Sequence, residues 1–356
     1  MKKVAVLFGG RSQEHEISIL SASAVIGALN AAGFEPVPIG IGKRGDWYHI
    51  ISDMDGIVSL DDKRFRALIP NDGNEASEGA TRIEPYELTR LADFAFPVLH
   101  GPYGEDGTVQ GLFEMFGMPY AGCGVAASAI AMDKIFSKEL LIRAGLPVCG
   151  HTAAYAKDFA ARREQELCRI ETELGYPVFV KPANMGSSVG VGRATDRAGL
   201  AAAIDEALKY DSRILIETEV KGRELETAIL GNDDLQPGAV GEIVTESEFY
   251  DYDTKYRGSG ARLDIPADIP ERVRDEIRGL ACAAFRTLGG SGFSRVDFFL
   301  EEGTEKVYIN EMNTIPGFTR YSMFPLLWEA NGVDFAELVE RIVGLGYERH
   351  YAKNHR

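Results

Sequence analysis

The sequence is poor in three features that mark particular classes of protein: clustered cysteines, long apolar runs and positive charge. Its four cysteines (Cys123, Cys149, Cys168 and Cys282) are scattered with no C-x-x-C spacing. That pattern is typical of reduced thiols in a cytoplasmic protein, and neither of a disulfide framework nor of a zinc site. No run approaches the ~20 apolar residues of a membrane span, and the apolar residues 4–8 are too few for a secretory signal. We therefore expect a cytoplasmic protein without a membrane partner.

Charge and length narrow the choice further. The formal net charge is −16, which argues against a nucleic-acid partner because such proteins need a basic face. An anionic nucleotide remains possible, since lysines and arginines can gather in one cleft. The 356 residues exceed one average hydrophobic core, so two or three domains are expected.

The N-terminal residues are patterned as an α/β unit. Residues 4–8 form a continuous apolar run, typical of a strand buried on both faces of a parallel sheet. A glycine turn, apolar residues at helical spacing up to Gly33 and a second apolar segment at 34–41 follow. This order predicts a parallel sheet with a helix packed against it. Further strands are predicted at 94–99, 177–181, 189–193, 214–217 and 225–230, and helices from Thr108, from Ala126 and over 200–210.

Two apolar runs near the C-terminus, 295–300 and 307–313, predict a β-hairpin with polar residues on one face. If the turn centres near Thr304, Asp297 lies opposite Glu311, with side chains about 5 Å apart. Asn313 shares the face of Glu311, because strand residues alternate. Two carboxylates and an amide oxygen at one point favour a hard cation such as Mg²⁺. The alternative is a solvated polar face, which the flanking Phe298 and other apolar residues make less favourable.

A glycine- and serine-rich segment could bind phosphate. Residues 181–192 (KPANMGSSVGVG) connect two predicted strands, so the spacing fits neither a Walker motif nor a Rossmann motif, both of which lead into a helix. Such a loop can fold over phosphates with backbone N–H groups and hydroxyls as donors, and Lys181 can add a cation. On its own it could equally be a hairpin turn. Lys134, in a predicted helix, would by itself be read as a surface lysine.

Taken together, these motifs closely resemble the D-alanine–D-alanine ligase family of the ATP-grasp superfamily. The resemblance is colinear over nearly the whole chain. It rests on segments 9–18, 100–107, 132–134, 180–190, 250–256, 295–297 and 311–317. It implies an α/β (α+β) ATP-grasp fold with an N-terminal parallel-sheet domain at 1–122, a central lobe at 123–216 and a C-terminal lobe at 217–356. A homodimer formed largely through the N-terminal domain is also implied.

The resemblance assigns residues to ATP and metal. Lys134 and Lys181 would contact the α- and β-phosphates, beneath the loop that holds Ser187 and Ser188. The residues that would border the adenine and the ribose are Glu217, Val220 and Glu224. The residues that would hold magnesium or manganese, two ions per site, are Asp297, Glu311 and Asn313.

The resemblance also assigns residues to the two D-alanines. Glu14 would bind the first ammonium, positioned by Ser187 and Tyr256, although Glu14 could merely favour a helix dipole. Arg295 and the Gly317 N–H would form the oxyanion site. The second carboxylate would meet Ser322 and Met323, and Lys255 would assist phosphoryl transfer.

Three further residues, one histidine and two acids, could be either structural or functional. His100 ends a predicted strand, where a structural hydrogen bond is the commoner role, but the resemblance implies a place near the carboxylate of the first D-alanine. Glu105 and Asp106 are expected to be first-turn acids that stabilise a helix N-terminus, not catalysts.

The implied reaction is ATP-dependent formation of D-alanyl-D-alanine through an acyl phosphate for peptidoglycan synthesis. Residues 250–260 predict a long loop of the kind that acts as a lid. The Lys255–Tyr256 pair at its tip is associated with an amine acceptor in this family. Alternatives are a D-alanine–D-lactate ligase, a carboxylate phosphotransferase or another ATP-grasp carboxylate–amine ligase.

Overall fold

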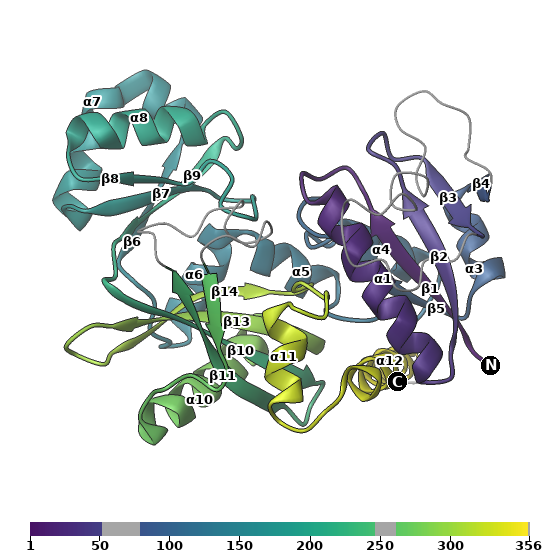
Figure 1. The fold of residues 1–356 in the computed structure, drawn as a ribbon. Helices are drawn as coiled ribbons and strands as arrows, with labels where there is room; N and C mark the ends of the chain where they lie inside the picture. The colour runs from purple at the N-terminus through teal and green to yellow at the C-terminus, as the bar shows by residue number, and fades with distance from the viewer. Residues whose placement is uncertain (52–78, 246–260, 355–356) are drawn as a thin grey trace.

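The computed structural model describes residues 1–51, 79–245 and 261–354, and each of its three lobes is built on its own sheet (Figure 1). The predicted Lys255 and Tyr256 therefore lie outside the described residues. The mixed α/β class predicted from the sequence is confirmed.

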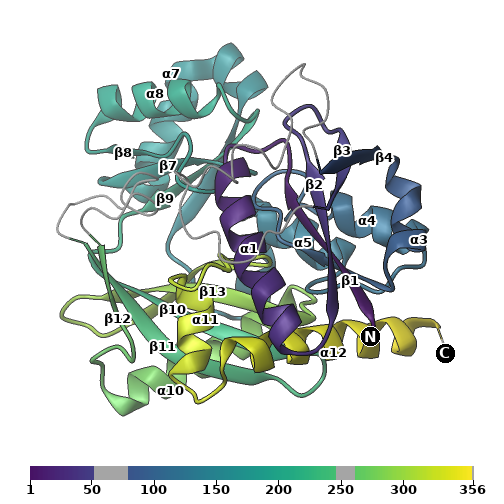
Figure 2. The ribbon, with the colours of Figure 1, turned by 45° about the vertical axis from the view of Figure 1, so that its right-hand side comes forward.

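The N-terminal lobe has the sheet order β4-β3-β2-β1-β5. β1 pairs in parallel with both β2 and β5, as predicted, and every β1 residue after Lys3 is buried. Helix α1 covers this sheet between β1 and β2 (Figure 2). The elements are β1 (Lys3–Gly9), α1 (His15–Ala31), β2 (Glu35–Ile41), β3 (Trp47–Ile50), β4 (Ala80–Ile83), η1 (Pro85–Glu87), α3 (Leu88–Leu91), β5 (Phe94–Pro97) and α4 (Thr108–Met115).

Strands β3 and β4 were not predicted. They form an antiparallel extension at the edge of the sheet, and each buries only one of its four residues. Such short edge strands carry little apolar periodicity, which is the signal a sequence reading depends on.

The central lobe is an antiparallel sheet, β6-β9-β7-β8, with helices α7 and α8 against it (Figure 1). The strand predicted at 189–193 is wrong in extent, because β8 begins only at Gly192 and the residues before it form the loop. The elements here are β6 (His151–Tyr155), α7 (Ala156–Leu174), β7 (Val178–Pro182), β8 (Gly192–Ala194), α8 (Arg197–Ala207) and β9 (Arg213–Thr218). Two helices precede them, α5 (Val125–Met132) and α6 (Lys134–Arg143), and buried residues of both join the core of the C-terminal lobe.

The C-terminal lobe is a five-stranded antiparallel sheet, β12-β11-β10-β13-β14. β13 and β14 are the predicted hairpin. Helix α10 packs against β10, β11, β13 and β14, and α12 reaches across to α1 of the N-terminal lobe. The elements are β10 (Gly222–Gly231), β11 (Gln236–Thr245), β12 (Ala261–Asp264), α10 (Glu271–Thr287), β13 (Gly292–Glu301), β14 (Val307–Asn313), α11 (Met323–Glu329) and α12 (Phe335–Asn354).

An aromatic cluster joins the N-terminal and C-terminal lobes. Phe96 of β5 packs edge-on against Phe318, with ring centroids 5.7 Å apart. Phe318 also contacts Phe293 of β13 and Phe324 of α11, with centroids 5.4 and 5.2 Å away. All four rings are buried in one hydrophobic core. The central lobe has a separate core of residues from its own strands and helices.

Phe318→Ala should destabilise the protein by about 3–5 kcal/mol, because it removes a fully buried ring and leaves a cavity where two lobes meet. The shift can be measured as a lower urea midpoint. Tyr321→Ala is the matched control, since that ring is 78% exposed. Equal midpoints for the two variants would contradict the shared core.

Candidate active site

The predicted hairpin register is confirmed: Asp297 of β13 lies directly opposite Glu311 of β14. Arg295 donates two hydrogen bonds to the Asp297 carboxylate, Nε to Oδ1 and Nη2 to Oδ2, each 2.7 Å long. The Asn313 amide donates to the same carboxylate over 2.8 Å. Burial alone would lower the pKa of Arg295, but Asp297 and Glu226 outweigh it and raise that pKa. Arg295 therefore stays charged.

Lys134 connects the hairpin to the glycine–serine loop (residues 183–191). Its Nζ lies 3.3 Å from a carboxylate oxygen of Glu311 and donates to the Met185 carbonyl oxygen at 2.8 Å. Lys134 is the first residue of α6, and the Asp133 side chain caps that helix by accepting from the Ile135 N–H. The two motifs that the sequence suggested separately thus meet at one lysine.

The loop itself has an unusual backbone. Ser187 and Ser188 have φ angles of 51° and 59°, in the left-handed region that non-glycine residues rarely adopt. Gly190 is packed so closely that an added Cβ would lie 2.7 Å from the Tyr210 ring. Such strain persists only where the surroundings hold it, and it clusters at ligand sites.

Glu14 faces the loop from the N-terminal lobe. Its carboxylate accepts a hydrogen bond from the Ser187 hydroxyl at 2.5 Å. Gly101 and Gly186 border it, since a Cβ added to either would lie 3.4 Å from Glu14 Oε2. Two residues predicted to act on the same substrate group are therefore in direct contact.

A buried charge network lies at the end of β7. Lys181 Nζ and Lys138 Nζ each lie 2.6 Å from one of the two oxygens of Glu217. Burial would raise the pKa of Glu217, but Lys138 and Lys181 lower it well below its ordinary range. The Cys149 thiol donates to the same carboxylate at 3.3 Å. Burial, with the nearby Glu217 charge, raises the pKa of that thiol to about 11, so it stays protonated.

His100 is buried, and both ring nitrogens contact protein groups. Nδ1 lies 3.1 Å from the Ile315 carbonyl oxygen, which can only accept a hydrogen bond, and Nε2 lies 3.3 Å from the Ser21 hydroxyl. The first contact ties the end of β5 to the segment that leads into Gly317.

The segment after β14 is fixed by its own hydrogen bonds. The Ser322 hydroxyl oxygen accepts from the Thr319 N–H at 3.0 Å and contacts the Thr319 hydroxyl at 2.8 Å. A Cβ on Gly317 would lie 2.9 Å from that Ser322 oxygen, so the chain turns tightly here. Met323 begins α11 and is buried.

The remaining predicted nucleotide residues lie where β9 leads into β10. Glu217 is in β9, Val220 is in the connection, and Glu224 is in β10 opposite Phe299.

The donor set of the hairpin fits a hard divalent cation. Asp297, Glu311 and Asn313 offer only oxygen ligands on the protein side, the type that Mg²⁺ and Mn²⁺ prefer. Across the described ranges no group of three or more His, Cys, Asp or Glu residues is placed to hold a metal. These two carboxylates therefore suit an ion that draws its other ligands from phosphate or water.

Comparisons with known proteins identify the family. The models described as "D-ala D-ala ligase N-terminus" and "D-ala D-ala ligase C-terminus" match residues 3–123 and 140–344. The chain belongs to the D-alanine–D-alanine ligase family. This ligase-family chain is 46% identical to the D-alanine–D-alanine ligase of Geobacillus thermodenitrificans, over 99% of its own length and 97% of that relative. It is 44% identical to the D-alanine–D-alanine ligase of Acetivibrio thermocellus, over 98% and 96% respectively.

Solved ligase structures share the fold. A D-Ala:D-Ser ligase from Enterococcus faecalis matches with a TM-score of 0.81 and 36% identity, over 97% of this chain and 99% of that one. The D-alanine–D-alanine ligase from Coxiella burnetii matches with a TM-score of 0.81 and 32% identity, over 99% and 95%. The predicted ATP-grasp fold class agrees with these neighbours. Among the described residues, no helix is both long and apolar enough to cross a membrane.

Two residues of this ligase-family site were missed by sequence reasoning. Lys138 lies four positions after Lys134, so the helical period places both on one face of α6, and that spacing was the available signal. Glu226 of β10 lies opposite Asp297, and its carboxylate is 2.8 Å from Arg295 Nε. The signal available in the sequence was that Glu226 is a charged residue within a predicted strand of alternating pattern.

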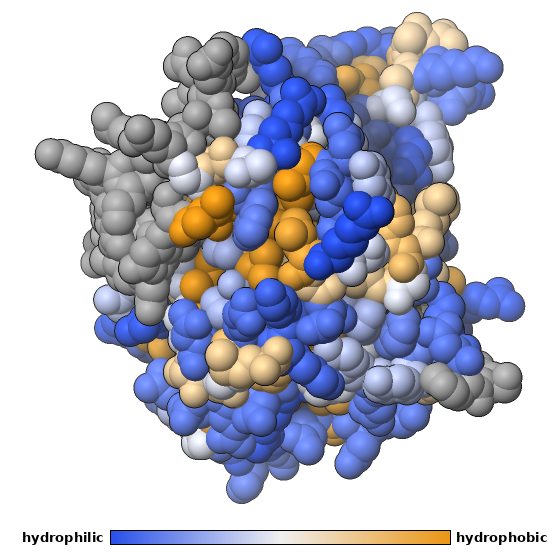
Figure 3. All heavy atoms as spheres, turned by 90° about the vertical axis from the view of Figure 1, so that its right-hand side faces the viewer, coloured by the Kyte–Doolittle hydropathy of each residue, from blue (hydrophilic) through white to orange (hydrophobic). Residues whose placement is uncertain are grey.

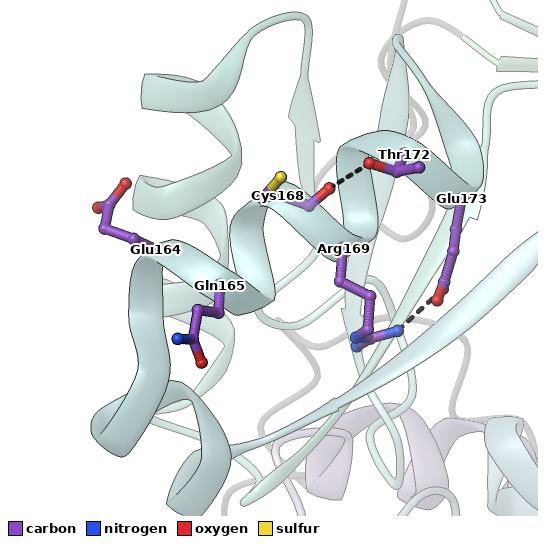
Figure 4. Close-up of a pocket in the computed structure, with 6 residues that line it drawn as sticks. All are labelled: Glu164, Gln165, Cys168, Arg169, Thr172 and Glu173. Atoms are coloured by element: carbon purple, nitrogen blue, oxygen red, sulfur yellow. Dashed lines mark hydrogen bonds and ion pairs between the residues drawn. The ribbon is translucent and has the colours of Figure 1, made fainter.

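A pocket also lies along α7, away from these residues (Figure 4). Arg169 donates to Glu173 at 2.8 Å, and the Thr172 hydroxyl donates to the Cys168 carbonyl at 2.7 Å. One helix supplies the whole lining, and none of the site residues contributes to it. The residues are Glu164, Gln165, Cys168, Arg169, Thr172 and Glu173.

Neither Glu105 nor Asp106 lies in the first turn of α4, and of the expected stabilising contacts only that of Asp106 is found. Asp106 accepts from the Thr108 N–H at 3.0 Å, at the start of α4. Glu105 instead turns back and accepts from the Gly101 N–H at 2.7 Å. Burial, together with the negative charge of Glu14, raises the pKa of Glu105 to about 8.

The raised pKa of Glu105 makes folding stability depend on pH. At a pH between the pKa of the unfolded chain (about 4.3) and the raised pKa of the folded chain, Glu105 is protonated only in the folded state. The free energy of unfolding therefore falls as the pH rises through this range, by at most ~1.4 kcal/mol per pH unit. Glu105→Gln cannot lose that proton, and it keeps an oxygen to accept from Gly101. Its melting temperature should therefore fall less than that of the wild type from pH 5 to pH 8. Exposed Glu329→Gln is the control, and parallel curves for Glu105→Gln and wild type would contradict the assignment.

Proposed function

We propose that this protein joins two D-alanine molecules into D-alanyl-D-alanine and converts ATP to ADP and phosphate. The observation that carries the proposal is the position of Lys134. Its ammonium contacts both Glu311 of the acidic hairpin and the Met185 carbonyl of the glycine–serine loop. A triphosphate lying between loop and hairpin would meet donors on one side and cation ligands on the other.

The nucleotide would lie between the central and C-terminal lobes. Lys134 and Lys181 would bind the phosphates, and the backbone and hydroxyls of Ser187 and Ser188 would cover them. Glu217 and Val220 would border the adenine, and Glu224 the ribose hydroxyls, because they line the β9–β10 connection. Lys255 is proposed for the phosphoryl-transfer end from the family resemblance alone.

The bound metal, magnesium or manganese as two ions per site, would neutralise phosphate charge while held by Asp297, Glu311 and Asn313. In the structure these acids already face cations: Arg295 binds Asp297, and Lys134 contacts Glu311. The protein thus limits the repulsion between the two carboxylates, which like charges at that spacing would otherwise feel.

The first D-alanine would be activated as an acyl phosphate. Glu14 would bind its ammonium, and the Ser187 hydroxyl holds the Glu14 carboxylate in place at 2.5 Å. A carboxylate oxygen of D-alanine attacks the γ-phosphorus, the bond to ADP breaks, and the acyl phosphate forms. This step needs in-line positioning and charge neutralisation rather than a protein nucleophile. Tyr256 is proposed as a further positioning group from the resemblance.

The second D-alanine would attack the acyl phosphate through its amine. The nitrogen bonds to the carbonyl carbon, phosphate leaves and the nitrogen loses a proton. Arg295 and the Gly317 N–H would stabilise the oxyanion, since preorganised donors cost no reorganisation during the reaction. Ser322 and Met323 would receive the second carboxylate. His100, whose Nδ1 lies 3.1 Å from the Ile315 carbonyl oxygen, is proposed to lie near the carboxylate of the first D-alanine.

We further propose a cytoplasmic homodimer. Cytoplasmic ATP suits the reaction. On the side formed by the N-terminal lobe, apolar side chains gather in a patch among polar ones (Figure 3). In the same lobe, Ile51 is 70% exposed. A patch of this kind fits the predicted dimer contact.

The proposal is tested by measuring phosphate release in the presence of ATP and Mg²⁺. The assay is run with D-alanine alone, with L-alanine alone, and with D-alanine mixed with either D-serine or D-lactate. Release and dipeptide formation with D-alanine alone are expected. D-serine belongs in the assay because the Enterococcus faecalis neighbour is a D-Ala:D-Ser ligase. Hydroxylamine should trap a D-alanyl hydroxamate, which separates a ligase from a kinase. No release with D-alanine under any of these conditions would refute the function.

Asp297→Ala and Glu311→Ala should each lower turnover by on the order of a hundredfold or more, because each removes a proposed ligand of the catalytic ion. Glu302→Ala is the matched control, since it removes an exposed acid from the turn of the same hairpin. Chelation of the divalent ion should stop the wild type reversibly. Near-normal dipeptide synthesis by either ligand variant would overturn the metal assignment.

A further inference from the structure

Lys138 is a buried charge to which the proposed reaction gives no role. It lies in α6, and its side chain is 2% exposed. A lysine is almost never buried so fully unless it is paired. Its Nζ donates to the Asn310 carbonyl oxygen at 3.0 Å and to the Cys149 sulfur at 3.9 Å, and it lies 2.6 Å from Glu217 Oε1.

These contacts use the full donor capacity of Lys138. An ammonium has three N–H donors and no acceptor, and three protein acceptors surround this one: Glu217, Asn310 and Cys149. Lys138 therefore acts on its neighbours and cannot itself donate to a nucleotide without losing one of them. The neighbour that matters is Glu217, because it is the only carboxylate among the three.

Glu217 is shared between two lysines of different exposure. Its other oxygen lies 2.6 Å from Lys181 Nζ, and Lys181 is 15% exposed, against 2% for Lys138. Two ammonium groups on one carboxylate leave a net charge of +1. The more exposed lysine of this triad is Lys181, so the surplus positive charge lies on the side nearer to solvent.

Without Lys138 the net charge of the cluster would fall from +1 to zero. Glu217 and Lys181 alone would form a neutral pair, and Coulomb attraction between them is strong because both are removed from water. Lys181 would then hold Glu217 and offer little field to an anion. A purely structural contact between α6 and β9 would need no charge, since an apolar pair of similar volume commonly serves as well or better.

We propose that Lys138 is a positioning residue of the nucleotide site, which neutralises Glu217 from the inner side so that Lys181 presents its positive charge to a phosphate group. This inference rests on the proposed function in one respect, that Lys181 receives phosphate. Lys138 acts through Glu217 and touches neither ATP nor D-alanine.

The test is a double-mutant cycle with ATP KM, D-alanine KM and kcat as readouts, using Lys138→Met, Glu217→Gln and the double variant. Lys138→Met should raise ATP KM by about tenfold or more while D-alanine KM changes little, because nucleotide binding is the affected step. In the Glu217→Gln background no anion remains to neutralise, so adding Lys138→Met should change ATP KM by less than about twofold. Any contact between Glu217 and adenine cancels in that comparison.

The matched control is Lys209→Met, which removes an exposed lysine paired with Glu206 in the same lobe and should leave ATP KM unchanged. If Lys138→Met does not fold, Glu217→Gln and the double variant still test the role, since both replace the carboxylate that Lys138 is proposed to neutralise and the comparison isolates any effect of Lys138 that does not act through Glu217. A wild type that forms no dipeptide would refute the proposed function. An active wild type with unchanged ATP KM in Lys138→Met, or a double variant whose ATP KM exceeds that of Glu217→Gln by more than about fivefold, would overturn the role of Lys138.

Discussion

The arrangement of the site depends on the repulsion between Asp297 and Glu311, which face each other across neighbouring strands. Two carboxylates at this spacing are stable only when positive charge lies beside them. The protein supplies that charge from two directions, through Arg295 within the same strand and through Lys134 from the start of α6. Lys134 in turn contacts the glycine–serine loop of the central lobe. The hairpin, the start of α6 and the glycine–serine loop are thus in contact through the residues that balance one acidic pair.

A second buried cluster balances charge in the same way, but with lysines in excess over acid. In the hairpin, cations balance surplus acid, while at the end of β7 a single acid holds two lysines. Both clusters are buried or nearly so, where charges interact far more strongly than in water. The lysine cluster keeps a surplus positive charge, whereas in the hairpin Glu226, which also contacts Arg295, leaves a surplus of acid. A site for ATP and a divalent metal needs both kinds of surplus, because one ligand is an anion and the other a cation.

The parts that could be predicted from the sequence are those with a local signal. The pairing of Asp297 with Glu311 was predicted from two apolar runs about Thr304, although in the structure an irregularity between Asp297 and Phe298 shifts the register to produce it. β1 was predicted from one uninterrupted apolar run. The contact of Glu14 with Ser187 came from the family resemblance, since 173 positions separate the two residues. The family, the fold class and the ligase activity were identified in the same way. The division into domains at 122 and 216 and the individual residue roles stay predictions.

The parts that were missed depend on partners distant in sequence. The spacing of Lys138 from Lys134 places both on one face of α6, but the burial of Lys138 requires Cys149, Glu217 and Asn310 to converge, which the spacing does not show. Glu105 was misread because its carboxylate turns back to Gly101 instead of capping α4. Strands β3 and β4 were missed because they lie at a sheet edge with few buried residues.

The aromatic cluster has a consequence for how the chain is made. Phe96 belongs to a lobe built from the first part of the chain, yet the rings that pack against it, Phe293 and Phe318, are added late in translation. Helix α12, which packs on α1, is later still. Domains usually fold in order as they leave the ribosome. Here the part of the first sheet around Phe96 is covered on one side by α1, and the rest of its apolar contacts form only once these late segments have been synthesised.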